Sequence, residues 1–264
     1  MSITGWNFTA WPLTAKTERV HPRAWVRVFA IITALILCVI PHGAWRLLRI
    51  RSPWPQIFLS LSARIAGARV TVRGKPVKRD VLYIANHISW LDILTLSGNT
   101  GCAFVAKADM IDWPVFGWMA SLNNSVYVSR ENRLDVGAQK IAIQTALVTG
   151  QAIALFPEGT TANGRDLLPF RSSLLATVAP PPSGITVQPV AIDYGASAPD
   201  IAWTEDESVG VNALRIMGRQ QRLNVILHFL EPLDPADFSD RKAMAAHSRA
   251  EIAAVLFPAY SAQP

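Results

Sequence analysis

Cysteine is scarce in this sequence, and its placement excludes two kinds of small scaffold. Only Cys38 and Cys102 occur among the 264 residues. Neither belongs to a C-x-x-C pair or to a spacing typical of zinc sites, so neither a disulfide framework nor a structural metal site is indicated. A reducing compartment that faces the cytoplasm is the default for such a chain.

Acidic residues are almost absent from the first 80 positions. This stretch holds thirteen Lys and Arg against only Glu18 and Asp80, a net charge of about +11, whereas residues 81–264 carry about −5. A basic segment binds nucleic acid or anionic lipid, depending on the residues between its charges. Here those residues are apolar, and five of the nine Trp lie in the first 54 positions. The sequence therefore favours membrane lipids as the partner, and nucleic acid is not expected.

A long uninterrupted apolar run is also missing. The strongest run, residues 28–40, has about 13 residues where a spanning helix needs roughly 20, and Pro41 is expected to end or kink a helix there. Trp and Arg flank this run on both sides, a pattern typical of interfacial anchors. We therefore expect residues 1–55 to form a basic, apolar membrane-anchoring segment. An interfacial or re-entrant position is at least as favoured as a full span.

Two different interpretations of this segment stay open. It could be a buried core helix, or a cleaved signal peptide, although the apolar run begins late and no convincing small-x-small cleavage site follows it. A second apolar segment, residues 54–67, has the composition to pack against the first. As an anchor, the segment would hold the protein on the cytoplasmic face of the inner (plasma) membrane.

From about residue 68 onward, short runs rich in β-branched residues alternate with helical stretches. The predicted strands are 69–74, 81–85, 102–107, 125–130, 152–159, 185–194 and 223–233. The predicted helices are 89–97, 131–150 and 240–256. Such alternation predicts an α/β fold over residues 56–264, with a layered mixed sheet flanked by helices behind the N-terminal membrane-associating helical segment. Residues 196–221, of mixed polarity with Pro199 and Gly210, are interpreted as a loop excursion.

Two common catalytic signatures are missing. No G-x-S-x-G occurs, so a hydrolase nucleophile elbow is not indicated. Gly159 and Gly164 have the spacing of G-x-x-x-x-G, but Arg165 and Asp166 stand where a P-loop needs Lys and then Ser or Thr, which disfavours nucleotide binding.

The turn at the end of the predicted strand 152–159 is nevertheless a candidate binding element. Pro157 ends the strand, and Glu158, Gly159 and Thr160 follow it. Glycine permits a ligand to approach the backbone, and the amides and hydroxyls of such a turn suit a phosphate or another polar headgroup. The alternative is a plain turn with no function.

A histidine and an aspartate interrupt the apolar stretch 83–94. If His87 and Asp92 were both helical, they would point about 140° apart and could not cooperate. If His87 instead lies in a turn between a strand and a helix, its ring can reach the Asp92 carboxylate. That contact would fix the tautomer and leave the other ring nitrogen basic. Ser89 is more often a helix cap than the nucleophile of a Ser-His-Asp set.

Several blocks taken in order resemble one enzyme family. They are NHISWLD at 86–92, Lys107 with the following WPVFGW, YVSR ending at Arg130, FPEGTT at 156–161, and VQPVAIDY at 187–194. Over about residues 55–240, their order and spacing are similar to those of the glycerolipid acyltransferases, of the lysophosphatidic-acid acyltransferase type with an H-x4-D motif.

The resemblance implies a role for each matching residue. It assigns His87 as the general base on an acceptor hydroxyl and Asp92 as its orienting partner. It places Lys107, Arg130, Glu158, Gly159 and Thr160 at the substrate. It also implies an acyl thioester donor, either acyl-CoA or acyl carrier protein, with no metal and no other cofactor.

The acceptor implied by the resemblance is a lyso-lipid, first of all 1-acyl-glycerol-3-phosphate, which would give phosphatidic acid. The family often has Arg after FPEGT, whereas Thr161 stands here. Lyso-ornithine lipid, or another lysophospholipid, is therefore an alternative acceptor. Two further hypotheses stay open for the whole chain: a hydrolase, and a non-catalytic membrane-binding protein of the same fold.

Overall fold

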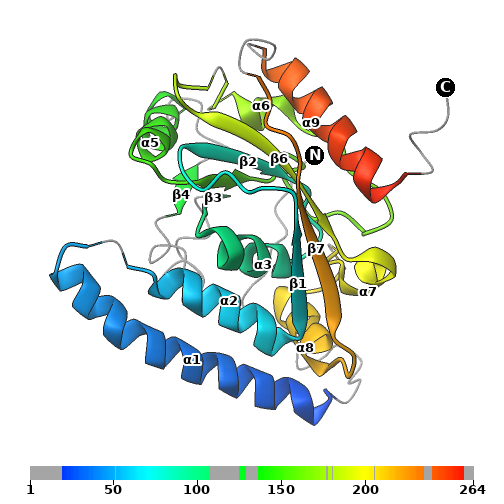
Figure 1. Cartoon of the computed structure of the whole chain (residues 1–264). Coiled ribbons are helices and arrows are strands. Elements are labelled where there is room, and N and C mark those ends of the chain that lie inside the picture. Colours follow the sequence, from blue (N-terminus) through cyan, green and yellow to red (C-terminus); the bar gives the residue numbers. More distant parts are fainter. Residues whose placement is uncertain are drawn as a thin grey trace.

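The strands of the computed structural model form one sheet (Figure 1). The structure describes residues 20–50, 52–107, 125–128, 136–176, 178–179, 181–204, 206–234 and 240–258. Its strands are β1 (Ala68–Arg73), β2 (Val81–Ala85), β3 (Ala103–Lys107), β4 (Val126–Val128), β5 (Ile153–Leu155), β6 (Thr186–Asp193) and β7 (Leu223–Phe229). Each lies in a run that the sequence predicted as a strand, except that β1 begins one residue before its run. Their order across the sheet is β1-β7-β6-β2-β5-β3-β4.

The direction of the strands determines where the functional turns lie. Neighbouring strands are parallel except for the antiparallel pair β6 and β7, which confirms the predicted mixed sheet. Because β2, β5 and β6 are parallel neighbours, their carboxyl ends meet at one edge, where ligands of α/β sheets usually bind. His87 follows β2, Glu158 follows β5 and Tyr194 follows β6. The sheet thus brings these three turns together.

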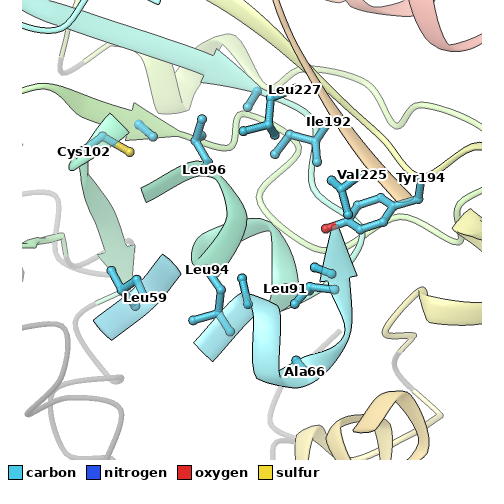
Figure 2. Close-up of a cluster of buried hydrophobic side chains, with 14 of the residues drawn as sticks. Leu59, Ala66, Leu91, Leu94, Leu96, Cys102, Ile192, Tyr194, Val225 and Leu227 are labelled. Carbon is cyan, nitrogen blue, oxygen red and sulfur yellow. The ribbon is translucent and has the colours of Figure 1, made fainter. Parts of the chain in front are cut away.

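Different helices cover the two faces of the sheet (Figure 1). One face carries α2 (Trp54–Ala66), α3 (Leu91–Thr100) and α8 (Val209–Gly218), and the other carries α5 (Val136–Val148), α6 (Ser172–Leu175) and α9 (Arg241–Leu256). Strand β2 is buried on both faces: Val81, Tyr83 and Ala85 join the first apolar cluster, whereas Leu82 and Ile84 join the second. Figure 2 shows part of the first cluster, where Leu91, Leu94 and Leu96 of α3 lie among side chains of α2 and the sheet.

The first helix, α1 (Pro22–Leu47), packs against α2 and α8. It runs through Pro41, so an end of the helix at that residue is ruled out. Proline removes one helical hydrogen bond. Buried residues before and after Pro41 in the sequence pack against the protein and hold the helix together. Cys38 and His42 are buried, and His42 Nδ1 lies 2.8 Å from Ser52 Oγ.

The residues that the structure describes cover α1 on one side only. It is long and apolar enough to cross a membrane, and just 17% of its most apolar 18-residue window is buried. The interpretation as a buried core helix is therefore wrong. The Arg27 guanidinium fastens the covered side by donating to the carbonyl oxygens of Met217, at 2.8 Å, and Arg219, at 3.1 Å, where α8 ends.

The interpretation of residues 196–221 as a loop is also wrong. This stretch contains most of a short 3₁₀ helix (Gly195–Ser197), α7 (Ala198–Ile201) and α8. Ser208 caps α8 by accepting a hydrogen bond from the Val211 amide. Asn212, Ile216 and Met217 are buried on one side of the helix. Ile216 and Met217 pack into the first apolar cluster, and this packing stabilises a helix where the mixed polarity of the sequence indicated a loop.

Candidate active site

The turn after β2 is held to the sheet by an asparagine side chain. Asn86 Nδ2 donates to the Ile192 carbonyl at 3.1 Å, and Asn86 Oδ1 accepts from the Ile192 amide at 2.8 Å. This pair of bonds continues the pairing of β2 with β6 by one side chain. It places the residue that follows, His87, at a fixed point on the edge of the sheet.

His87 and Asp92 make the predicted contact. The His87 ring lies in the turn, and its Nδ1 is 2.8 Å from Asp92 Oδ2, in the first turn of α3. The same oxygen accepts from the amides of Ile88, at 2.7 Å, and Ser89, at 2.9 Å. An ionised carboxylate only accepts hydrogen bonds. Nδ1 therefore carries a proton, and in the neutral ring Nε2 is the nitrogen with the free lone pair.

An aromatic ring sets the plane of the imidazole. Phe156 stacks on His87 with ring centroids 4.1 Å apart and planes at 9°. Phe104 stacks in turn on Phe156, at 5.4 Å. The His87 side chain remains 16% exposed, so the ring is held between Phe156 and Asp92 and is still accessible. A histidine held in this way is suited to proton transfer.

Ser89 bonds the start of α3 as a capping residue does, although the assigned N-cap residue is Trp90. Its Oγ accepts a hydrogen bond from the Leu91 amide at 3.3 Å while its own amide donates to Asp92. The two bonds form a reciprocal arrangement like a capping box, with aspartate in the place of the usual glutamate. The assigned helix begins at Leu91, two residues after Ser89.

Tyr194, the last residue of the VQPVAIDY block, completes the surroundings of Asp92 and is not among the predicted site residues. Its hydroxyl donates to Asp92 Oδ1 at 2.6 Å, and both side chains are buried. Burial, and then the nearby Asp92 charge, raise the pKa of Tyr194 well above its ordinary value, so this hydroxyl keeps its proton. The signal that could have identified it is its place directly after a strand parallel to β2.

The Glu158 carboxylate is hydrogen-bonded to the turn that contains His87. One carboxylate oxygen accepts from the His87 amide at 2.7 Å and the other from the Leu168 amide at 3.0 Å. Burial raises the pKa of Glu158 to about 7, although these two hydrogen bonds act in the opposite direction. Its described contacts are thus with the protein backbone, and its predicted contact with substrate stays a prediction.

The rest of the FPEGTT segment closes over the same turn. Gly159 has φ +76°, a left-handed conformation that favours glycine, and its amide donates to the Phe156 carbonyl oxygen at 3.1 Å. The Ala162 amide donates to the His87 carbonyl at 2.8 Å. Thr160 is partly exposed beside this turn. The His87 backbone is therefore bonded to this segment through both its amide and its carbonyl.

Residues 196–221, which the sequence predicted as a loop, provide further hydrogen bonds to the turn that contains His87. The Trp203 amide donates to the Ile88 carbonyl at 2.8 Å, and the Thr161 hydroxyl donates to the Trp203 carbonyl. On the other side of the turn, Trp90 Nε1 donates to Asn212 Oδ1 at 3.0 Å. Sequence reasoning missed Trp203 and Asn212 because both contacts join residues more than 40 positions apart.

Lys107 and Arg130 are the two remaining residues predicted to bind substrate. Lys107 is the last residue of β3, at the same edge of the sheet as the histidine turn. Arg130 lies outside the described residues, two positions after β4. Within the part of the chain that the structure describes, no three His, Cys, Asp or Glu side chains gather in a way that could hold a metal ion.

Known proteins are similar to this chain in sequence and fold. Residues 69–193 match the family model described as Acyltransferase. The lyso-ornithine lipid O-acyltransferase of Brucella abortus is 33% identical over 88% of this chain and 94% of its own length. The 1-acyl-sn-glycerol-3-phosphate acyltransferase of Neisseria gonorrhoeae is 32% identical over 62% of this chain and 64% of its own.

A solved structure supports the architecture. The crystal structure of the 1-acyl-sn-glycerophosphate (LPA) acyltransferase PlsC from Thermotoga maritima has a TM-score of 0.61 and 20% identity. The match covers 92% of this chain and 99% of the other. At that identity the likeness shows a common fold, which agrees with the predicted α/β class. The match to the family model and the length of the Brucella alignment establish that the chain belongs to the acyltransferase family.

Proposed function

We propose that this protein transfers a fatty acyl group from an acyl thioester to the hydroxyl of a lyso-lipid, with His87 as the general base. The observation that carries the proposal is the hydrogen bond between His87 Nδ1 and the buried Asp92 carboxylate, which leaves Nε2 as the basic nitrogen. Acyl-CoA or acyl carrier protein is the donor. The described residues supply the base and its orientation, and the proposed chemistry uses no cofactor.

The proposed reaction has two proton transfers. His87 Nε2 removes the proton of the acceptor hydroxyl while the hydroxyl oxygen attacks the thioester carbonyl. The tetrahedral intermediate then expels the thiolate, and the imidazolium donates to it the proton taken from the acceptor hydroxyl. Asp92 stabilises the imidazolium between the two transfers. General-base catalysis of this kind contributes about 10²- to 10⁴-fold, and alignment of the two substrates contributes the rest.

For the acceptor we propose lyso-ornithine lipid, ahead of 1-acyl-glycerol-3-phosphate. The support is twofold: the Brucella relative with this specificity aligns over most of both chains, and the cation that often follows FPEGT is absent. In its place, the Thr161 hydroxyl is engaged by the Trp203 carbonyl. The residues predicted to bind substrate stay the same: Lys107, Arg130, Glu158, Gly159 and Thr160.

The test is a product assay with purified protein in mixed micelles. Lyso-ornithine lipid and 1-acyl-glycerol-3-phosphate are each offered with acyl-CoA and with acyl carrier protein, and products are identified by mass spectrometry. We expect diacylated ornithine lipid to form with the higher kcat/KM. Faster formation of phosphatidic acid would reverse the choice of acceptor. Free fatty acid without acylated lipid would indicate a hydrolase, and no thiol release would indicate a non-catalytic protein.

We further propose that the uncovered side of α1 lies in the cytoplasmic leaflet of the inner membrane, as the anchor predicted for residues 1–55. Large apolar side chains repeat on this side at helical spacing and are mostly exposed: Trp25, Phe29, Ile32, Ile36 and Ile40. Donor chains and acceptor lipid are amphipathic, so an enzyme held at this surface meets both. The basic residues around α1 add attraction to anionic lipid.

Polar substitution on this side should release the protein from membranes. In the triple variant Phe29→Gln, Ile36→Gln, Ile40→Gln, we expect the partition coefficient for anionic vesicles to fall about tenfold or more, because each side chain contributes up to about 1.5–3 kcal/mol when fully buried. Cosedimentation with vesicles measures it. Activity on short-chain, monomeric lyso-lipid should be retained.

Ile141→Gln is the matched control, since Ile141 is 64% exposed on α5, across the sheet from α1. It should bind vesicles as the wild type does. If the triple variant also cosedimented like the wild type, this side of α1 would not be the anchor.

A further inference from the structure

We propose that Tyr194 is a positioning residue for the His87 and Asp92 pair, holding the Asp92 carboxylate in the orientation that the His87 ring requires. This inference rests on the proposed function, because it assumes that His87 is the base. The carrying observation is the 2.6 Å hydrogen bond from the Tyr194 hydroxyl to Asp92 Oδ1.

The two carboxylate oxygens of Asp92 have different surroundings. Oδ2 accepts from His87 Nδ1 and from two backbone amides. Among the described residues, Oδ1 accepts only from Tyr194. Asp92 has no exposed surface, so water cannot replace a missing donor there. Without the tyrosine hydroxyl, Oδ1 would be a buried, unsatisfied acceptor, and rotation of the carboxylate would disturb the bond to His87.

The fold places this hydroxyl independently of α3. Tyr194 directly follows β6, and the two Asn86 hydrogen bonds fix the end of β6 next to the end of β2. The Tyr194 ring lies in the apolar cluster with Val225, and its hydroxyl oxygen is at the inner end of the side chain (Figure 2). Asp92 is therefore held from two sides, by its own turn and by a separate strand.

A second buried tyrosine shows the ordinary solution. Tyr83, in β2, is fully buried, and its hydroxyl donates to the backbone carbonyl of Val77. Each tyrosine thus satisfies its hydroxyl, but only Tyr194 does so on the carboxylate that contacts the base. Tyr83→Phe is consequently a matched control: it also removes a buried hydroxyl and a hydrogen bond without touching Asp92.

The experiment compares Tyr194→Phe with Tyr83→Phe in the acyl-transfer assay, using whichever lyso-lipid the wild-type enzyme acylates. For Tyr194→Phe we expect kcat to fall roughly ten- to hundredfold, the effect of one hydrogen bond to a charged group. Both KM values should change by less than about threefold, because neither substrate loses a contact. Tyr83→Phe should keep kcat within about twofold of the wild type. Rates are expressed per folded protein, from denaturation curves of each variant.

A second measurement separates positioning from general stability. In the Asp92→Asn background, Tyr194→Phe should lower kcat by less than about threefold, because the interaction it supports is already lost. An equal loss in both backgrounds would overturn the proposal, and so would equal effects of the two Tyr→Phe changes. If His87→Ala kept its activity, the proposed function itself would fail. If His87→Ala were inactive while Tyr194→Phe behaved like Tyr83→Phe, only this inference would fail.

Discussion

His87→Ala should lose about 10²- to 10⁴-fold in kcat for acyl transfer, the range expected when a general base is removed. The structure gives the reason: Nδ1 is engaged by Asp92, and the ring is fixed against Phe156, so Nε2 is the nitrogen available for the acceptor proton. Thiol release measured at saturating donor and lyso-lipid checks the result. Folding should be little changed, because the side chain is partly exposed and the turn is held by backbone hydrogen bonds.

His247→Ala provides the comparison for this variant. His247 lies in α9, on the face of the sheet away from α3, and we expect its replacement to leave kcat within about threefold of the wild type. A His87→Ala protein that kept more than about a tenth of wild-type turnover would contradict the role of His87 as the base.

Asp92→Asn should have the second largest effect, a loss of about 10²- to 10⁴-fold in kcat, similar to that of a serine-protease triad whose aspartate becomes asparagine. The amide that replaces the carboxylate has one accepting oxygen, whereas Asp92 accepts from His87, Ile88, Ser89 and Tyr194. We therefore also expect a lower free energy of unfolding, because buried donors lose their partners. Kinetics and chemical denaturation of the same preparation check both.

The control for charge is Asp200→Asn, which neutralises a mostly exposed carboxylate paired with Arg219 at 3.4 Å. This change should alter neither the activation free energy calculated from kcat nor the free energy of unfolding by more than about 0.5 kcal/mol, as is usual for surface positions. If Asp92→Asn resembled it, Asp92 would not be the partner of the base.

Local signals were sufficient to predict the centre of the site. The strand before Asn86 and the helix after Ser89 have distinct sequence patterns, and they leave His87 in the turn between them. The five-residue separation of His87 and Asp92 then allows one geometry in which the two side chains meet. Short range is what made this contact predictable.

The supports of the site could not be predicted in the same way. Tyr194, Trp203 and Asn212 reach the turn through contacts that depend on the order of the strands and on the packing of α8. Local patterns in a single sequence do not reveal either of these. In α1, likewise, packing around Pro41 outweighed a local rule against proline in helices. The alternation of strands and helices predicted the fold class, but it did not give the order of the strands in the sheet.

The hydrogen bonds around His87 also bear on how the chain matures. Asp92 is synthesised five residues after His87, but Glu158 follows 71 residues after His87, and Tyr194 follows 102 residues after Asp92. Contacts between such distant residues require closure of long loops and form late in folding. A nascent chain that has not reached β6 contains both proposed catalytic side chains but lacks Tyr194. If Tyr194 positions Asp92 as proposed, we expect the full rate of acyl transfer only after β6 has been synthesised and has paired with β2.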